Sequence, residues 1–176
     1  MTPPPRERLL TSTIELLRRY GVHGTGIADV LRESGTARQS IYHLFPAGKD
    51  ELVAAATRTA GEHIRHVARR GHVDALLTWW ERTLIEHDYD IGCPVAAAAL
   101  AGPDCPASTQ AAREVFATWR EDLAAALRLD DVADADLLAG VLVSAFEGAI
   151  IQARVERSAA PLRDVATVLR RLIGSE

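Results

Sequence analysis

A run of hydrogen-bonding side chains near residue 40 is the part of this 176-residue chain best equipped for chemistry. The run consists of Arg38, Gln39, Ser40, Tyr42 and His43. Arginine and glutamine side chains can pair with the edges of bases, while serine and tyrosine hydroxyls readily hold phosphates. These residue types in one short segment therefore indicate a surface that contacts DNA.

A pair of short helices is predicted around this run. Gly35 lies where a tight turn is expected, and Thr25 is a suitable cap for the helix before it. The apolar residues that would hold the two helices together are Ile27, Val30, Ile41 and Phe45. Two helices joined in this way form a helix-turn-helix, whose second helix can enter the major groove. An ordinary amphipathic helix pair shows the same spacing, so the spacing alone leaves both interpretations open.

The residue identities are more specific than their spacing. The segments are 24–30 (GTGIADV), 34–45 (SGTARQSIYHLF) and 49–52 (KDEL). Together they resemble the DNA-binding domain of the TetR family of bacterial regulators, and the resemblance is strong over residues 6–55. The segments 45–49 (FPAGK) and 92–96 (GCPVA), with Gly26 after Thr25, resemble the LmrA/YxaF-like branch. That branch includes repressors of multidrug-efflux and related genes.

This resemblance implies a set of residues that contact DNA. The set is Thr25, Gly26, Arg38, Gln39, Ser40, Tyr42, His43 and Lys49. Thr25 and Gly26 match hydroxyl and backbone contacts to phosphate, and Lys49, the only lysine of the chain, matches a further phosphate partner. Ala37, Gln39 and Leu44 depart from residues that are frequent in the family. The base preference of known members therefore cannot be transferred.

The charge of the chain is distributed unevenly. Residues 1–70 hold 11 basic and 7 acidic side chains, whereas residues 71–176 hold 9 and 17. Because phosphate attraction is a local property, a basic N-terminal part on an acidic body fits DNA binding at one end. No apolar run approaches the roughly 18–20 residues that span a bilayer, and the N-terminus lacks the apolar stretch of a secretory signal. We therefore expect a cytoplasmic protein without a membrane segment, with Cys93 and Cys105 as free thiols.

An all-α fold is predicted, because Ala and Leu dominate the apolar residues and no long alternating β pattern is present. About nine helices are expected, at residues 6–20, 25–34, 37–44, 49–69, 73–87, 93–100, 107–129, 134–157 and 161–173. Residues 1–48 would form the helix-turn-helix DNA-binding domain. Residues 49–176 would form a helical bundle for ligand binding and dimerisation, as the resemblance implies.

The segment 137–151 is apolar almost all round, so it must be covered on several sides. Gly140, Ser144 and Gly148 recur every four residues and allow another helix to approach closely. Paired with residues 162–173, this segment predicts a four-helix dimer interface. The expected interface residues are Gly140, Ser144, Gly148, Ile151, Leu169 and Leu172. A helix buried within a monomer is the alternative.

A largely apolar ligand pocket is expected in the same bundle, since ligand sites are mostly apolar and aromatic rings suit planar ligands. Its predicted lining is Ile64, Val67, Leu76, Trp79, Trp80, Leu84, Val95, Phe116, Trp119 and Phe146. For each of these residues, membership of an ordinary core is the alternative. Trp79 and Trp80 are neighbours on one helix and cannot both face the same way.

No catalytic set, metal site or cofactor is predicted. His63 and His66 lie three residues apart beside Glu62, but no third ligand follows at a recognisable spacing. Cys93 at a helix start could sense oxidants, or it could be a small buried residue. The sequence contains neither a glycine-rich phosphate loop nor a nucleophile elbow.

These features together predict a homodimeric repressor that binds a palindromic operator in double-stranded DNA and is released by a small, largely apolar effector. Two alternatives remain. Turnover or a co-purified cofactor would favour a small all-helical enzyme. An absence of salt-sensitive DNA binding would favour a protein-interaction adaptor.

Overall fold

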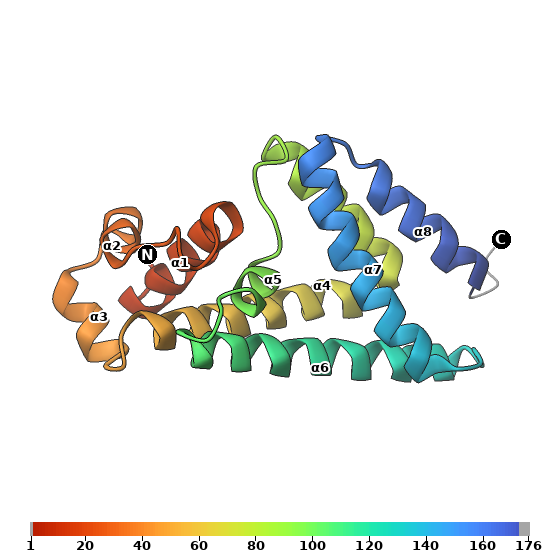
Figure 1. Cartoon of the computed structure of the whole chain (residues 1–176), viewed down its shortest axis with the longest axis horizontal. Helices are drawn as coiled ribbons and strands as arrows, with labels where there is room; N and C mark the ends of the chain where they lie inside the picture. The colour runs from red at the N-terminus through yellow and green to blue at the C-terminus, as the bar shows by residue number, and fades with distance from the viewer. Residues whose placement is uncertain (1, 173–176) are drawn as a thin grey trace. The chain divides into compact units, whose positions relative to one another are not determined.

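In a computed structural model, residues 2–172 of the chain are described, except for the side chains of residues 69–74 and 172. The described residues form helices and no strand, which confirms the all-α prediction. The helices are α1 (Pro5–Tyr20), α2 (Ile27–Ser34), α3 (Arg38–Leu44), α4 (Lys49–Glu86), α5 (Pro94–Ala99), α6 (Pro106–Leu129), α7 (Ala135–Glu156) and α8 (Ala160–Leu172) (Figure 1). The two helices expected at residues 49–69 and 73–87 are the single helix α4, which leaves eight labelled helices in the described part.

The start of α2 differs from the prediction. Its cap is Gly26 in an extended conformation, without a hydrogen bond from any capping side chain. The Thr25 hydroxyl, one residue earlier, donates to the carbonyl of Gly21 at 2.7 Å. The prediction that Thr25 caps this helix was therefore wrong, because its side chain turns back toward the end of α1.

The chain packs as two compact units, which are described separately. The first unit contains Met1–His63 and Cys93–Val115, and the second contains Ile64–Gly92 and Phe116–Glu176. This is a division by packing. The division into a DNA-binding domain up to residue 48 and a ligand-binding domain after it stays a prediction.

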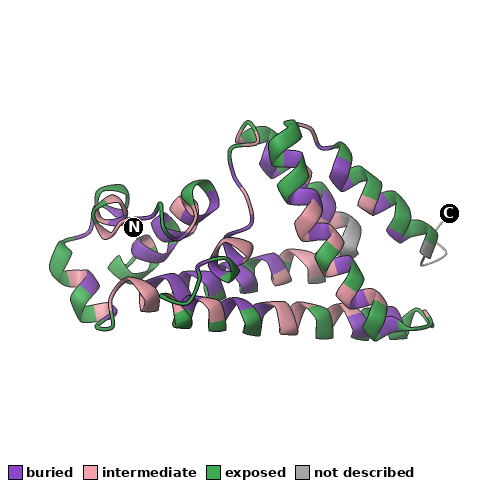
Figure 2. Ribbon diagram, viewed as in Figure 1, coloured by how far each residue is buried: buried purple, intermediate pink, exposed green. Residues whose placement is uncertain are grey.

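The first unit has its core where α1, α2 and α3 meet. Leu9, Leu17, Val30, Ile41 and Phe45 are each at most 2% exposed. Burying an aliphatic or aromatic side chain of this size contributes about 1.5–3 kcal/mol. The buried positions of α1–α3 lie on the sides that face one another (Figure 2). Of the small core predicted from apolar spacing, Val30, Ile41 and Phe45 are buried and Ile27 is half-buried.

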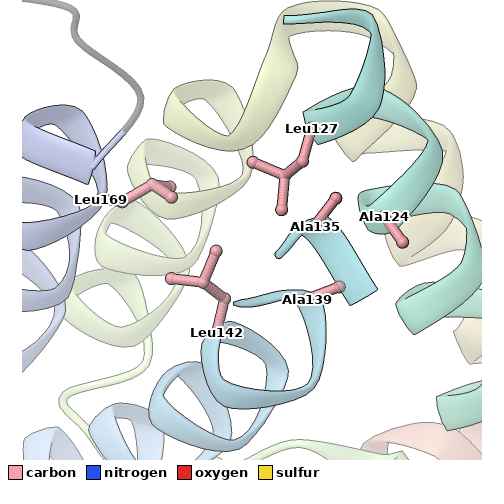
Figure 3. Packing of buried hydrophobic residues seen from close by; sticks show 6 residues of the cluster. All are labelled: Ala124, Leu127, Ala135, Ala139, Leu142 and Leu169. Carbon is pink, nitrogen blue, oxygen red and sulfur yellow. The ribbon is translucent and has the colours of Figure 1, made fainter. Parts of the chain in front are cut away.

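The second unit has a core built by α7 and α8 with parts of α4 and α6. One cluster consists of Ala124, Leu127, Ala135, Ala139, Leu142 and Leu169 (Figure 3). Trp80 is 0% exposed, and its ring centroid lies 6.2 Å from that of Phe146 in an edge-to-face contact. Ion pairs between Arg65 and Asp122 and between Arg163 and Glu81 join helices at the rim of this core.

Helix α7 corrects one expectation about the membrane. Its most apolar 18-residue window has a mean hydropathy of 1.5, and only 28% of that window is buried. By length and composition alone α7 could therefore cross a bilayer, contrary to the expectation that no apolar run is long enough. An apolar helix face that its own unit leaves uncovered is also what a protein–protein interface requires.

Candidate functional site

The exposed face of α3 carries the hydrogen-bonding side chains that the sequence singled out. Ile41 is 0% exposed and anchors the helix to the core, whereas Tyr42 is 52% exposed. Arg38, Gln39 and His43 are also exposed, and Ser40 is half-buried. The outward side of α3 therefore carries a guanidinium, an imidazole, an amide and two hydroxyl groups. On the other side of the helix, Ile41 packs into the apolar core.

The turn before α3 fixes the direction of this face. Gly35 adopts the left-handed conformation, with φ of 59°, at the end of α2, where residues with a Cβ are disfavoured. The hydroxyls of Ser34 and Thr36 lie 2.8 Å apart across the turn, and both side chains are buried. Ala37 caps α3 without a side-chain hydrogen bond, as expected from the missing serine or threonine.

The two expected phosphate contacts at the start of α2 differ in accessibility. Thr25 is 1% exposed, and its hydroxyl is engaged with Gly21, so this side chain does not reach the surface in the structure. Gly26 is half-buried, and a Cβ at this position would lie 2.8 Å from a carboxylate oxygen of Asp29. A glycine thus lets the backbone pass close to that side chain.

Lys49 begins α4, directly after a closed turn that follows α3. The Gly48 N–H donates to the Phe45 carbonyl at 2.9 Å, and Gly48 has φ of 84°. The Ala47 N–H donates to a carboxylate oxygen of Glu51 at 2.8 Å. Lys49 itself is half-buried, and no ion pair to it is found among the described side chains. Lys49 is therefore joined to α3 by a short hydrogen-bonded turn.

Asp50 is a residue that sequence reasoning missed. Its carboxylate accepts hydrogen bonds from the N–H groups of Ala107 (2.8 Å) and Ser108 (2.9 Å) and from the Ser108 hydroxyl. Burial raises the pKa of Asp50, but the three hydrogen bonds lower it by more, so the pKa lies below the ordinary value of 3.8. Asp50 and Ser108 are 58 residues apart, and no local pattern predicts their contact.

Half of the ten residues predicted to line a ligand pocket are buried core residues. Trp80, Leu84 and Val95 are 0% exposed, and Ile64 and Phe146 are buried. The remaining five, Val67, Leu76, Trp79, Phe116 and Trp119, are half-buried. The structure brings Trp79, Trp80 and Phe146 into one aromatic group, and Phe116 and Trp119 into edge-to-face contact with centroids 5.6 Å apart. Val95 belongs to the first unit, whereas the other nine belong to the second.

The two hollows described in the structure have other linings. One, of about 450 Å³, lies in the first unit beside Arg6, Phe45 and the start of α4. The other is a groove of about 1150 Å³ in the second unit, between α6, α7 and α8. None of the ten predicted pocket residues lines either hollow, so their role in ligand binding stays a prediction.

The groove between α6, α7 and α8 contains three of the six predicted dimer residues. Gly140, Ser144 and Gly148 line it, and Ile151 beyond them is 53% exposed. Leu169 differs from the prediction, because it is 3% exposed and packs inside the cluster of Figure 3. Val168 is instead the exposed apolar residue of that turn, at 53%. The side chain of Leu172 lies outside the described part.

The candidate metal and redox residues are not gathered into a site. His63 and His66 are both exposed, and Cys93 is buried. Across the part of the chain that the structure describes, no group of three His, Cys, Asp or Glu side chains could hold a metal ion.

Comparison with known proteins places these features in a family. The model of bacterial regulatory proteins of the TetR family matches residues 9–56, and the model of the LmrA/YxaF-like transcriptional regulator C-terminal domain matches residues 71–168. The HTH-type transcriptional regulator Rv0196 of Mycobacterium tuberculosis is 36% identical, over 98% of this chain and 95% of its own. YxaF of Bacillus subtilis is 25% identical, over 92% and 91%.

A solved structure shares the fold. The regulatory protein TetR from Rhodobacter sphaeroides superposes with a TM-score of 0.82 at 22% identity, covering 94% of this chain and 96% of that one. The chain therefore belongs to the TetR family of transcriptional regulators and, by its C-terminal domain, to the LmrA/YxaF-like group. Its relatives are regulators of transcription rather than enzymes, which confirms the resemblance read from the sequence.

Proposed function

We propose that this regulator is a cytoplasmic homodimeric repressor that binds a palindromic operator through α3 and leaves it when a small effector binds. The observation that supports DNA contact most directly is the outward face of α3. Arg38, Gln39 and Tyr42 are exposed there, while Ile41 on the opposite side is fully buried. A short helix held in this way can lie in a major groove.

The proposed residues divide into two roles. Arg38 and Gln39 would read bases, since their side chains can make paired hydrogen bonds to guanine and adenine. Ser40, Tyr42, His43 and Lys49 would hold the phosphate backbone and fix the position of α3 on the duplex. Gly26 would contribute its backbone at the start of α2. The buried side chain of Thr25 would support this helix start from behind.

The groove of the second unit supports dimerisation through α7 and α8. A Cβ added at Gly140 or Gly148 would meet nothing within 4 Å, so packing within the described protomer does not require glycine there. Leu137 and Val141 in the groove lining, and Ile151 and Val155 elsewhere on α7, are each more than half exposed. Small residues flanked by exposed apolar side chains fit the close approach of a second copy of the same helices. A two-fold dimer would present two α3 helices to a palindromic site.

The effector is proposed to be small and largely apolar, because the side chains of the second unit facing inward are aromatic and aliphatic. Trp79 and Trp119 are half-buried members of the two aromatic pairs. Binding that favours a protomer conformation unable to hold DNA would release the operator. Catalysis is not part of this proposal, and a small helical enzyme would be recognised by turnover of a candidate ligand.

Gel-shift titration with the promoter beside the regulator's own gene tests the proposal. Tyr42→Ala and Lys49→Ala should weaken binding to all sequences. Arg38→Ala and Gln39→Ala should change the preferred bases, at about 1–3 kcal/mol per lost base contact. Tyr20→Ala is the matched control, since Tyr20 is 61% exposed at the end of α1 and outside the proposed interface. Equal affinity of all four variants and wild type would refute the site assignment.

A further inference from the structure

We propose that Asp50 is the positioning residue that ties the proposed DNA-contacting end of α4 to the start of α6 and so holds the α3 and Lys49 interface in its binding position. This inference rests on the proposed DNA interface at α3 and Lys49. It assigns to a single carboxylate the task of holding that interface in its binding position. Asp50 itself would not touch DNA.

The tie is a helix cap supplied from a distant part of the chain. The first N–H groups of a helix have no partner within the helix, and a carboxylate placed there satisfies them and matches the helix dipole. α6 begins at Pro106, and Asp50 accepts the N–H groups of the next two residues, Ala107 and Ser108. The Ser108 hydroxyl adds a third bond from a side chain that is 0% exposed.

The segment between α3 and Asp50 is closed by its own hydrogen bonds. The Phe45 N–H donates to the Ile41 carbonyl (2.7 Å), and the Leu52 N–H donates to the Gly48 carbonyl (3.1 Å). Phe45 is 2% exposed and is covered by the guanidinium of Arg6, 5.8 Å from the ring centroid. A displacement of Asp50 is therefore passed to Lys49 and α3 rather than absorbed by a slack loop.

Further along, α4 and α6 stay in contact within the first unit. Arg58 pairs with Glu114 at 2.9 Å. One turn later, a Cβ on Gly61 would lie 2.6 Å from a methyl carbon of Val115, so the two helices approach very closely there. The Arg58–Glu114 pair is exposed and is expected to contribute little on its own. The cap by Asp50 is a contact between α4 and α6 at the N-terminal end of α4, the end that follows α3 along the chain.

The test compares Asp50→Ala with Ser108→Ala by gel-shift titration at a temperature well below unfolding. Asp50→Ala removes the whole cap and should weaken binding to the promoter fragment about fivefold, which corresponds to about 1 kcal/mol. Ser108→Ala removes one of the three hydrogen bonds and should weaken binding by less, and the double variant should lose no more than Asp50→Ala alone, because both changes act on the same tie. Unfolding is measured in parallel to show that each variant is fully folded at the titration temperature.

The direction of the change in DNA affinity distinguishes a positioning role of Asp50 from a purely electrostatic one. Removing a carboxylate near DNA strengthens binding when charge alone matters. Glu33→Ala, at an exposed position of α2, is the matched control and should bind equally or slightly more tightly. If Asp50→Ala behaves like Glu33→Ala, or lowers only the unfolding temperature, the inference is overturned. If wild type and Tyr42→Ala also bind equally, the proposed interface itself fails.

Discussion

Lys49→Gln should change the salt dependence of operator binding by an amount that the structure specifies. Lys49 is the only lysine of the chain, is half-buried at the start of α4, and stands one residue before the anchored Asp50. A side chain that holds one phosphate contributes about 0.9 to the slope of log K against log salt. A dimer places two copies on the operator, so the variant's slope should be shallower by about 1.8.

This slope difference is large enough to measure. Between 50 and 200 mM salt, wild type should lose roughly tenfold more affinity than Lys49→Gln. Fluorescence anisotropy with a labelled promoter fragment at four or five salt concentrations gives the two slopes. Lys49→Arg keeps the positive charge and should restore the wild-type slope. Parallel lines for wild type and Lys49→Gln would refute the phosphate contact, and a difference near 0.9 would indicate that one protomer binds.

Three further outcomes are expected. Gly148→Leu should weaken the dimer roughly tenfold or more in analytical ultracentrifugation. The protomer should stay folded because a Cβ at this position meets nothing within 4 Å. Gly148→Ala should have a smaller effect, and an unchanged dimer would exclude this face from the interface. Trp80→Ala should lower the free energy of unfolding by about 3–5 kcal/mol in urea titrations, and the half-buried Trp79→Ala by clearly less; equal losses would contradict the core position of Trp80. The pKa of Asp50 is lowered in the folded state, so this carboxylate should stabilise the fold fully above its unfolded pKa of about 3.9 and lose that contribution as the pH falls through the lower folded pKa. Asp50→Asn should remove this part of the acid-induced loss of unfolding free energy. Identical pH profiles for wild type and Asp50→Asn would count against the cap.

The local part of the fold was predictable from sequence. Helix propensity and apolar spacing gave the short helices around Gly35 and the burial of Val30, Ile41 and Phe45. The apolar spacing also predicted the outward face of α3, where Arg38, Gln39, Tyr42 and His43 are exposed. The DNA contacts that the resemblance implies for these residues stay a prediction. These features depend on residues within one or two helical turns, where spacing in sequence translates directly into position.

Contacts between distant segments were not predictable. The cap of α6 by Asp50 joins residues 58 apart, and the bond from His23 Nε2 to the Ala101 carbonyl (2.8 Å) joins residues 78 apart. The turn of Thr25 toward Gly21 depends on the path of the loop before α2. Leu169 and Val168 are neighbours on a helix, so only the packing of α8 decides which one is buried.

The pocket residues illustrate a related limit. Apolar and aromatic residues at helical spacing predict burial, and Trp80 and Leu84 are buried as that pattern requires. The same pattern does not distinguish a residue that packs against its neighbours from one that lines a cavity. The distinction depends on volume left between helices, which side-chain type alone does not determine.

Selection of binding sites from random double-stranded DNA tests the central claim most directly. The purified regulator should enrich an inverted repeat whose half-sites lie about 10–10.5 base pairs apart, or a multiple of that distance. Gln39→Ala should enrich a repeat with the same spacing but different bases within each half-site. Two results would contradict sequence reading by α3. One is that wild type enriches no sequence, and the other is that wild type, Gln39→Ala and Arg38→Ala all enrich the same bases.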